Sequence, residues 1–135
     1  MTHTESTVAS PTSPIIVVED SDNVRHFLVD LLEADGLPVL DFSSSIRAAR
    51  IRNAPQLLIT DLPLEGLNGL ELARELRRRF PKLPVLFVSE ERYPADQQIE
   101  GDGPVAFLAK PFFTDALRET VRALLNQTKD APALS

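Results

Sequence analysis

Five polar residues each follow or end a short apolar run of the chain: Glu19, Asp20, Asp61, Ser89 and Lys110. Three of them are carboxylates, which repel one another when they come within a few ångströms, so a pocket that holds them needs a cation or a proton. Hard oxygen ligands of this kind suit Mg²⁺ or Mn²⁺. A lysine and a hydroxyl at the same place would add a second positive charge and a hydrogen-bond donor.

These groups together are suited to phosphoryl transfer. A carboxylate such as Asp61 can attack phosphorus and form an acyl phosphate. The transition state spreads negative charge over the equatorial oxygens, and a metal ion and the Lys110 ammonium would stabilise that charge. Each residue alone has a simpler explanation, since Glu19-Asp20 could cap a helix and Lys110 could be a solvated side chain. The prediction therefore requires a fold that brings the five together.

Alternating strand and helix signals supply such a fold. Strands are predicted at residues 15–18, 39–42, 57–60, 85–88 and 105–109. An apolar stripe of helical spacing comprises Val24, Phe27, Leu28, Leu31 and Leu32, with Gly36 ending the helix. Further helices are predicted from Ser44 or Ser45 through Arg52, over 69–79, and from Thr114 or Asp115 onward. The alternation indicates a parallel sheet whose functional crevice lies at the carboxyl ends of the strands.

The composition favours one domain, at residues 14–126, between flexible polar tails at 1–13 and 127–135. The absence of cysteine excludes disulfides and thiolate metal sites. Neither a signal peptide nor an apolar run of about 20 residues is present, so we expect a cytoplasmic protein without membrane contact. The net charge of −6 argues against nucleic-acid binding. One basic cluster, Arg74, Arg77, Arg78, Arg79 and Lys82, is interpreted as a solvated helix face, with docking of an acidic partner as the alternative.

Over residues 14–126 the sequence resembles the receiver domains of bacterial two-component response regulators. The motifs that carry the resemblance are residues 15–20, Arg25, Asp61-Leu62, Leu67-Asn68-Gly69, Ser89, Phe107 and Lys110-Pro111-Phe112. The resemblance implies a flavodoxin-like α/β fold, which is a doubly wound, five-stranded parallel sheet in the order 2-1-3-4-5. It also implies a cis bond between Lys110 and Pro111.

The resemblance assigns a role to each matching residue. Asp61 is implied to be the phosphoacceptor and Lys110 the residue that binds the phosphoryl group. Ser89 and Phe107 match the switch hydroxyl and the switch aromatic. For the metal ion, Asp20 is implied as a direct ligand, Glu19 as a ligand acting largely through water, and Pro63 as a ligand through its backbone carbonyl. No cofactor beyond Mg²⁺ or Mn²⁺ is implied.

Two features depart from the family pattern. Glu65 stands where proline is usual, and Glu90 follows the switch hydroxyl where a small residue is usual, so extra negative charge could slow phosphoryl entry or alter the acyl phosphate's lifetime. Residues 90–104 contain two prolines and two glycines and no helical stripe. We therefore expect the fourth helix of the family to be short, displaced or disordered, and a disordered segment there would suit an order–disorder switch.

Three functions are compatible with a fold of this kind. The first is a single-domain response regulator that takes a phosphoryl group from a sensor histidine kinase or a histidine phosphotransfer protein. It would signal to an output protein through protein–protein contacts, with homodimer formation left open, and would catalyse nothing beyond its own phosphorylation and dephosphorylation. The second is a degenerate receiver that acts as a phosphorylation-independent interaction module, which Glu65 and Glu90 favour. The third, a phosphohydrolase, would need an acid at the position of Pro63.

Overall fold

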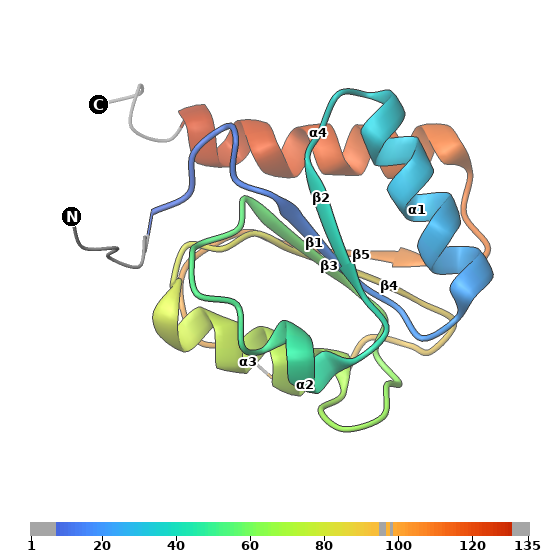
Figure 1. Cartoon of the computed structure of the whole chain (residues 1–135), viewed down its shortest axis with the longest axis horizontal. Coiled ribbons are helices and arrows are strands. Elements are labelled where there is room, and N and C mark those ends of the chain that lie inside the picture. Colours follow the sequence, from blue (N-terminus) through green and yellow to red (C-terminus); the bar gives the residue numbers. More distant parts are fainter. Residues whose placement is uncertain (1–7, 95–96, 98, 131–135) are drawn as a thin grey trace.

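The computed structural model describes residues 8–94, 97 and 99–130, and it forms a five-stranded parallel sheet flanked by helices (Figure 1). The strands are β1 (Ile15–Val18), β2 (Val39–Phe42), β3 (Leu57–Thr60), β4 (Val85–Ser89) and β5 (Val105–Ala109). The helices are α1 (Asp22–Ala34), α2 (Ser45–Ala48), α3 (Gly69–Arg79) and α4 (Thr114–Asp130). The strand order β2-β1-β3-β4-β5 confirms the predicted fold.

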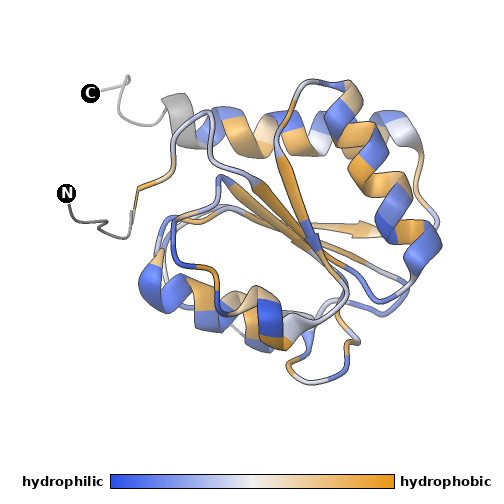
Figure 2. Cartoon of the chain, in the orientation of Figure 1, coloured by the Kyte–Doolittle hydropathy of each residue, from blue (hydrophilic) through white to orange (hydrophobic). Residues whose placement is uncertain are grey.

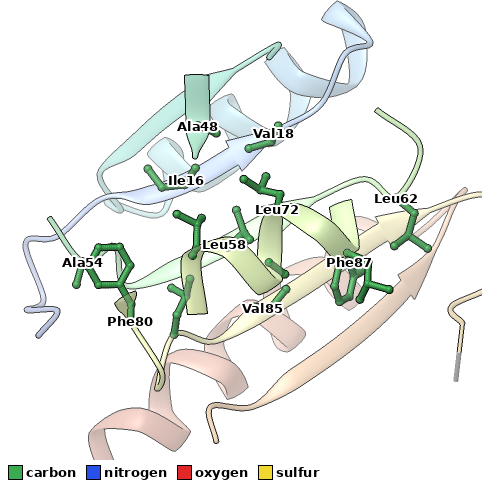
Figure 3. Packing of buried hydrophobic residues seen from close by; sticks show 14 residues of the cluster. Ile16, Val18, Ala48, Ala54, Leu58, Leu62, Leu72, Phe80, Val85 and Phe87 are labelled. Atoms are coloured by element: carbon green, nitrogen blue, oxygen red, sulfur yellow. The ribbon is translucent and has the colours of Figure 1, made fainter. Parts of the chain in front are cut away.

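The central strands β1 and β3 are buried at every position and are apolar except for Thr60, as expected for a sheet covered on both faces. Alternate residues of β1 therefore face different cores. Ile16 packs in a cluster with α2 and α3, and Ile15 in a second cluster with α1 and α4. Figure 2 shows the matching pattern, with hydrophobic strands and helices that carry both hydrophobic and hydrophilic residues. Figure 3 shows the first cluster, where side chains of the sheet meet Ala48 of α2 and Leu72 of α3.

Helix α1 begins and ends as predicted, but its buried face differs. Ser21 is the N-cap and accepts a hydrogen bond from the Val24 amide, and Gly36 follows the helix with a positive φ of 80°. The buried residues are Arg25, Leu28 and Leu32. Phe27 is exposed, so its inclusion in the inward stripe was wrong. Val24 and Leu31 are partly buried and pack against the same core as Leu28 and Leu32, so the rest of the predicted stripe is confirmed. Arg25 joins this inward face.

Helix α2 is shorter than predicted, because it ends at Ala48 instead of continuing through Arg52. The chain after it tightens into i to i+3 hydrogen bonds, as between the Ile51 amide and the Ala48 carbonyl at 3.3 Å. Arg79 of α3 donates to the carbonyls of Ala49 and Ile51 at 2.6 and 2.5 Å. These carbonyls lie just beyond the helix end and have no partner within the helix, and they find a donor in the neighbouring helix.

No helix forms between β4 and β5 among the described residues of 90–104, which excludes positions 95, 96 and 98. Arg77 of α3 instead holds the end of this segment, donating to the carbonyls of Glu100 and Pro104 at 3.3 and 3.0 Å and to Leu83 at 2.9 Å. Arg77 is 2% exposed, so the interpretation of the basic cluster as a solvated face was wrong at this residue. The order–disorder switch stays a prediction.

The predicted tails lie only partly within the described residues, since 1–7 and 131–135 fall outside them. Of the N-terminal stretch that is described, Pro11 and Ser13 accept hydrogen bonds from the Gln56 side chain at 3.2 and 2.7 Å. At the other end, α4 runs to Asp130. Among the described helices, none combines the length and the apolar character needed to span a bilayer.

Candidate functional site

The sheet register places the candidate residues at one edge. Val18 of β1 pairs with Thr60 of β3, so Glu19 and Asp61 follow neighbouring strand ends. Ser89 ends β4, and its carbonyl accepts a 2.9 Å hydrogen bond from the Lys110 amide just beyond β5. The carboxyl edge thus gathers two carboxylates, a hydroxyl and an amine, as the parallel topology requires.

Lys110 joins the two acidic residues directly. Its Nζ lies 2.8 Å from Oε1 of Glu19 and 2.7 Å from Oδ2 of Asp61. All three side chains are largely removed from solvent, with exposures of 14% for Lys110, 3% for Glu19 and 8% for Asp61. Charge-assisted bonds of this length in a buried pocket fix the relative positions of the three groups.

Burial and pairing act in opposite directions on this cluster. Burial raises the pKa of the Glu19 carboxyl above its ordinary value, although the hydrogen bond from Lys110 opposes that shift. Burial alone would lower the pKa of Lys110, but the hydrogen bonds to Asp61 and Glu19 raise it above the usual lysine value. Lys110 therefore carries its positive charge at neutral pH and acts as the resident cation of the pocket.

Asp61 is oriented from both sides of its carboxylate. Oδ1 accepts a 2.7 Å hydrogen bond from the Leu62 amide, and Oδ2 accepts from Lys110. Helix α3 begins close behind, since a Cβ on Gly69 would lie 1.9 Å from the carbonyl oxygen of Asp61. Only glycine permits this approach, which explains the glycine of the Leu67-Asn68-Gly69 motif. Asn68 caps the same helix through a reciprocal pair of hydrogen bonds with Glu71.

Ser89 and Phe107, the predicted switch residues, lie at the end of β4 and within β5. Ser89 is fully buried, and its Oγ accepts a 3.1 Å hydrogen bond from the Glu91 amide. The Phe107 ring is 6.0 Å from that of Tyr93, which in turn lies 5.2 Å from the ring of Phe87. Tyr93, from the segment between β4 and β5 whose described residues form no helix, thus lies against the predicted switch aromatic.

The predicted metal ligands are not assembled as a group. Asp20 and Pro63 are exposed, and no three acidic, histidine or cysteine side chains of the described residues are placed to hold a metal ion. The Lys110 ammonium lies between the carboxylates of Glu19 and Asp61 instead. The residue types still fit Mg²⁺, because three carboxylates and a backbone carbonyl are the hard oxygen donors that it prefers.

The two glutamates that depart from the family pattern are exposed. Glu65 and Glu90 lie at the surface, and the ion-pair partners of Lys110 in the described part of the chain are Glu19 and Asp61. The backbone beside Glu65 is fixed, because the buried Ser45 hydroxyl donates to its carbonyl at 2.8 Å. Solvent screens charges placed in this way, which weakens the expectation that they impair the site.

Comparisons with known proteins agree with this arrangement. The family model of the response regulator receiver domain matches residues 15–122. The alkaline phosphatase synthesis transcriptional regulatory protein SphR of Synechococcus elongatus is 34% identical over 137 residues, covering 93% of this chain and 53% of that protein. The transcriptional activator protein ExaE of Pseudomonas putida is 36% identical over 118 residues, covering 82% of this chain and 54% of that protein. The chain thus spans about half the length of these relatives.

Solved structures show the same likeness. A response regulator receiver domain protein from Clostridium thermocellum has a TM-score of 0.75 at 26% identity, covering 87% of this chain and 97% of that one. NtrX from Brucella abortus, solved in complex with ATP, has a TM-score of 0.77 at 26% identity, covering 91% of this chain and 29% of that one. Because the family model matches residues 15–122 and the strand order is that of the predicted fold, the chain belongs to the receiver domain family of two-component response regulators.

Proposed function

We propose that this receiver accepts a phosphoryl group on Asp61 and requires Mg²⁺ or Mn²⁺ to do so. The observation that supports this most strongly is the buried bridge that Lys110 makes between Glu19 and Asp61 at the carboxyl edge of the sheet. A lysine held there places a positive charge beside the carboxylate that would carry the phosphoryl group. Stabilisation of that kind, aimed at charge that develops during the reaction, is a major source of catalysis.

The two oxygens of Asp61 suggest which one reacts. Oδ1 is bound to the Leu62 amide, a backbone group that cannot leave. Oδ2 is bound to the flexible Lys110 side chain, which can transfer its hydrogen bond to a phosphoryl oxygen. We infer that Oδ2 attacks the phosphorus. The new Asp61 O–P bond replaces the N–P bond of a phosphohistidine donor, and the electron pair of that bond stays on the leaving imidazole.

A divalent ion bound at the acidic edge would neutralise charge on the transferring phosphoryl group. The residues available to hold it are Asp20, Asp61 and the carbonyl of Pro63, with Glu19 acting through water. Lys110 would share the pocket with that ion and would turn from the carboxylates to the phosphoryl oxygens. Ser89 would release the Glu91 amide and donate its hydroxyl to the same group.

The proposed donor is a sensor histidine kinase or a histidine phosphotransfer protein. This proposal is supported by the similarity of the chain to the receiver domain of a signal transduction histidine kinase from Syntrophus aciditrophicus and to the sensor kinase CckA of Brucella abortus. The signal would pass to an output protein through contacts made by the receiver surface. Phe107 and the Tyr93 ring over it are the described residues through which we expect that surface to change.

Phosphorylation can be tested with acetyl phosphate and Mg²⁺, followed by intact-mass measurement. We expect the wild type to gain the mass of one phosphoryl group and Asp61→Asn to gain none. Asp35→Asn is a matched control, because it removes a carboxylate that pairs with Arg118 on the surface. A wild type that gains no mass and shows no Mg²⁺-dependent NMR shifts would contradict the proposal and favour the phosphorylation-independent interaction module.

A further inference from the structure

Arg25 connects three elements around the acidic edge, and the resemblance gives it no role. It lies in the first turn of α1 with its side chain 11% exposed. Its Nη1 donates to the backbone carbonyl of Glu19 at 2.8 Å, its Nη2 to Asp22 at 2.6 Å, and its Nε to Asp41 of β2 at 3.1 Å. One guanidinium therefore links the end of β1 to the start of α1 and to the neighbouring strand.

The bond to Glu19 is the one that bears on the site. It is buried, whereas Asp22 and Asp41 are more exposed, with side-chain exposures of 75% and 39%. The carbonyl it holds belongs to the residue whose side chain contacts Lys110, and it precedes the peptide bond to Asp20. A shift of this carbonyl would rotate the turn from which both acidic side chains project.

A second contact shows that this turn is held in one position. The Ser21 amide donates to Oε2 of Glu19 at 3.1 Å, while Oε1 of the same carboxylate accepts from Lys110. The Glu19 residue is thus bound at its carbonyl by Arg25 and at both carboxylate oxygens by other groups. The Glu19 amide also donates to the Phe42 carbonyl of β2 at 3.1 Å. Among the side chains bound to Glu19, Arg25 adds a second link to β2, because its Nε is bound to Asp41.

We propose that Arg25 is a positioning residue for the metal-dependent reaction, and this inference rests on the proposed function. Its planar fork bonds the Glu19 carbonyl and Asp41 at once, and so sets the angle of the Glu19-Asp20 turn relative to Asp61. A lysine offers one compact ammonium with no fixed angle between donors and cannot hold both. Residues that orient metal ligands from outside typically change metal affinity 10- to 100-fold when they are replaced.

The test compares wild type with Arg25→Gln, Arg25→Lys and Asp41→Asn, and uses Arg118→Gln as the control. Arg118 makes a similar ion pair with Asp35, but between α4 and the end of α1. Two quantities are measured on each protein: the Mg²⁺ dissociation constant from NMR titration of the Asp20 and Leu62 amides, and the metal-free hydrogen exchange of the Ser21 amide. The second quantity reports the position of the Glu19 carboxylate without any metal.

We expect Arg25→Gln to raise the Mg²⁺ dissociation constant by about tenfold or more. Arg25→Lys should behave similarly despite its retained charge, and exchange at Ser21 should quicken in both. Asp41→Asn leaves α1 and its buried stripe intact, so it provides a folded variant for the test if the Arg25 variants do not fold. We expect it to change the Mg²⁺ dissociation constant and the Ser21 exchange in the same direction, but by less. Arg118→Gln should match wild type.

Two outcomes would contradict the inference, and they differ in what they say of the proposed function. If Asp41→Asn and every folded Arg25 variant bind Mg²⁺ within twofold of wild type and keep Ser21 exchange unchanged, the positioning role is wrong while the proposed function stands. If wild type itself binds no Mg²⁺, the proposed function fails first and the inference fails with it.

Discussion

The two arginines on the buried helix faces of this receiver, Arg25 and Arg77, are used differently. Both stand in an apolar series, Arg25 before Leu28 and Leu32, and Arg77 after Leu70 and Ala73. Arg25 has two carboxylate partners, and the hydrogen bond to Asp22 raises the pKa of its guanidinium. Arg77 is bound to three carbonyls, and burial lowers its pKa.

The difference shows that a buried arginine can serve to balance charge, as Arg25 does, or to support the backbone, as Arg77 does. Arg25 belongs to a network of carboxylates that ends at Asp61, so charge added at that sheet edge also acts on its ion pairs. The hydrogen-bond partners of Arg77 are neutral, and two of them, Glu100 and Pro104, belong to a segment that forms no helix among its described residues. The α3 arginine therefore supplies order that a regular helix would have supplied through its own hydrogen bonds.

The largest effect is expected from removing the carbonyl-bound arginine. Arg77→Ala should lower the free energy of unfolding by about 4 kcal/mol, because three carbonyls lose their donor in a mostly buried place. Urea denaturation measures this directly. Arg118→Gln, which breaks an ion pair on the surface, should cost less than about 1 kcal/mol. Equal losses in the two variants would show that Arg77 supports the segment no more than a surface residue does.

The next effect concerns the charged half of the comparison. Lys110→Met should lower stability at pH 7 by about 3 kcal/mol, because Glu19 and Asp61 stay buried without their cation. The folded-state pKa of Lys110 is raised, so its contribution is complete below the ordinary lysine pKa and is lost as pH rises through the raised value.

The difference in free energy of unfolding between wild type and Lys110→Met should therefore disappear at alkaline pH. It should also narrow in acid, because burial raises the pKa of the Glu19 carboxyl and protonation removes its unpaired charge. Unfolding curves at several pH values measure both changes. The gap for Arg77→Ala should be nearly constant over the same range, because its hydrogen-bond partners do not titrate. If the loss of stability in Lys110→Met did not depend on pH, the proposed difference between the charged site at Lys110 and the neutral one at Arg77 would be wrong.

A smaller effect is expected at Gly101, which follows the Glu100 carbonyl that Arg77 binds. Gly101 has a φ of 90°, and a Cβ there would lie 2.3 Å from the carbonyl oxygen of Pro81. Gly36 has a similar φ of 80° but open space around it. Gly36→Ala should cost about 1 kcal/mol for its conformation alone, and Gly101→Ala about 2 kcal/mol in total, because its Cβ also meets the backbone. Similar melting temperatures would show that the segment at Gly101 shifts freely.

Much of the fold follows from the sequence for one reason. Strands buried on both faces must be apolar throughout, and runs such as residues 15–18 cannot be mistaken for amphipathic helices. The parallel order then brings Glu19, Asp61 and Lys110 to one edge, where they are in contact. Their meeting could be predicted because parallel topology converts distant positions in the chain into neighbours, whereas their roles are implied only by the resemblance to receiver domains.

The burial of Arg77 could not be predicted in the same way. A charged residue on a helix is normally solvated, and the partners that make its burial tolerable lie up to 27 positions later, at Pro104. The sequence carries one indication of this burial. Arg77 stands in an apolar series of helical spacing, where a charged residue is unusual. Arg25 gave the same signal. Phe27, two residues later, fits the apolar pattern and yet is exposed, so hydrophobicity alone does not identify the buried face of α1.

Tyr93 has a practical consequence. It is the only tyrosine of a chain without tryptophan, so the ultraviolet emission of the protein comes from this one ring. That ring lies against Phe107, the residue proposed to move when Asp61 is phosphorylated. Emission intensity, anisotropy and near-ultraviolet circular dichroism should therefore report the activation state of the native protein in real time. No dye or engineered fluorophore is needed to follow the switch.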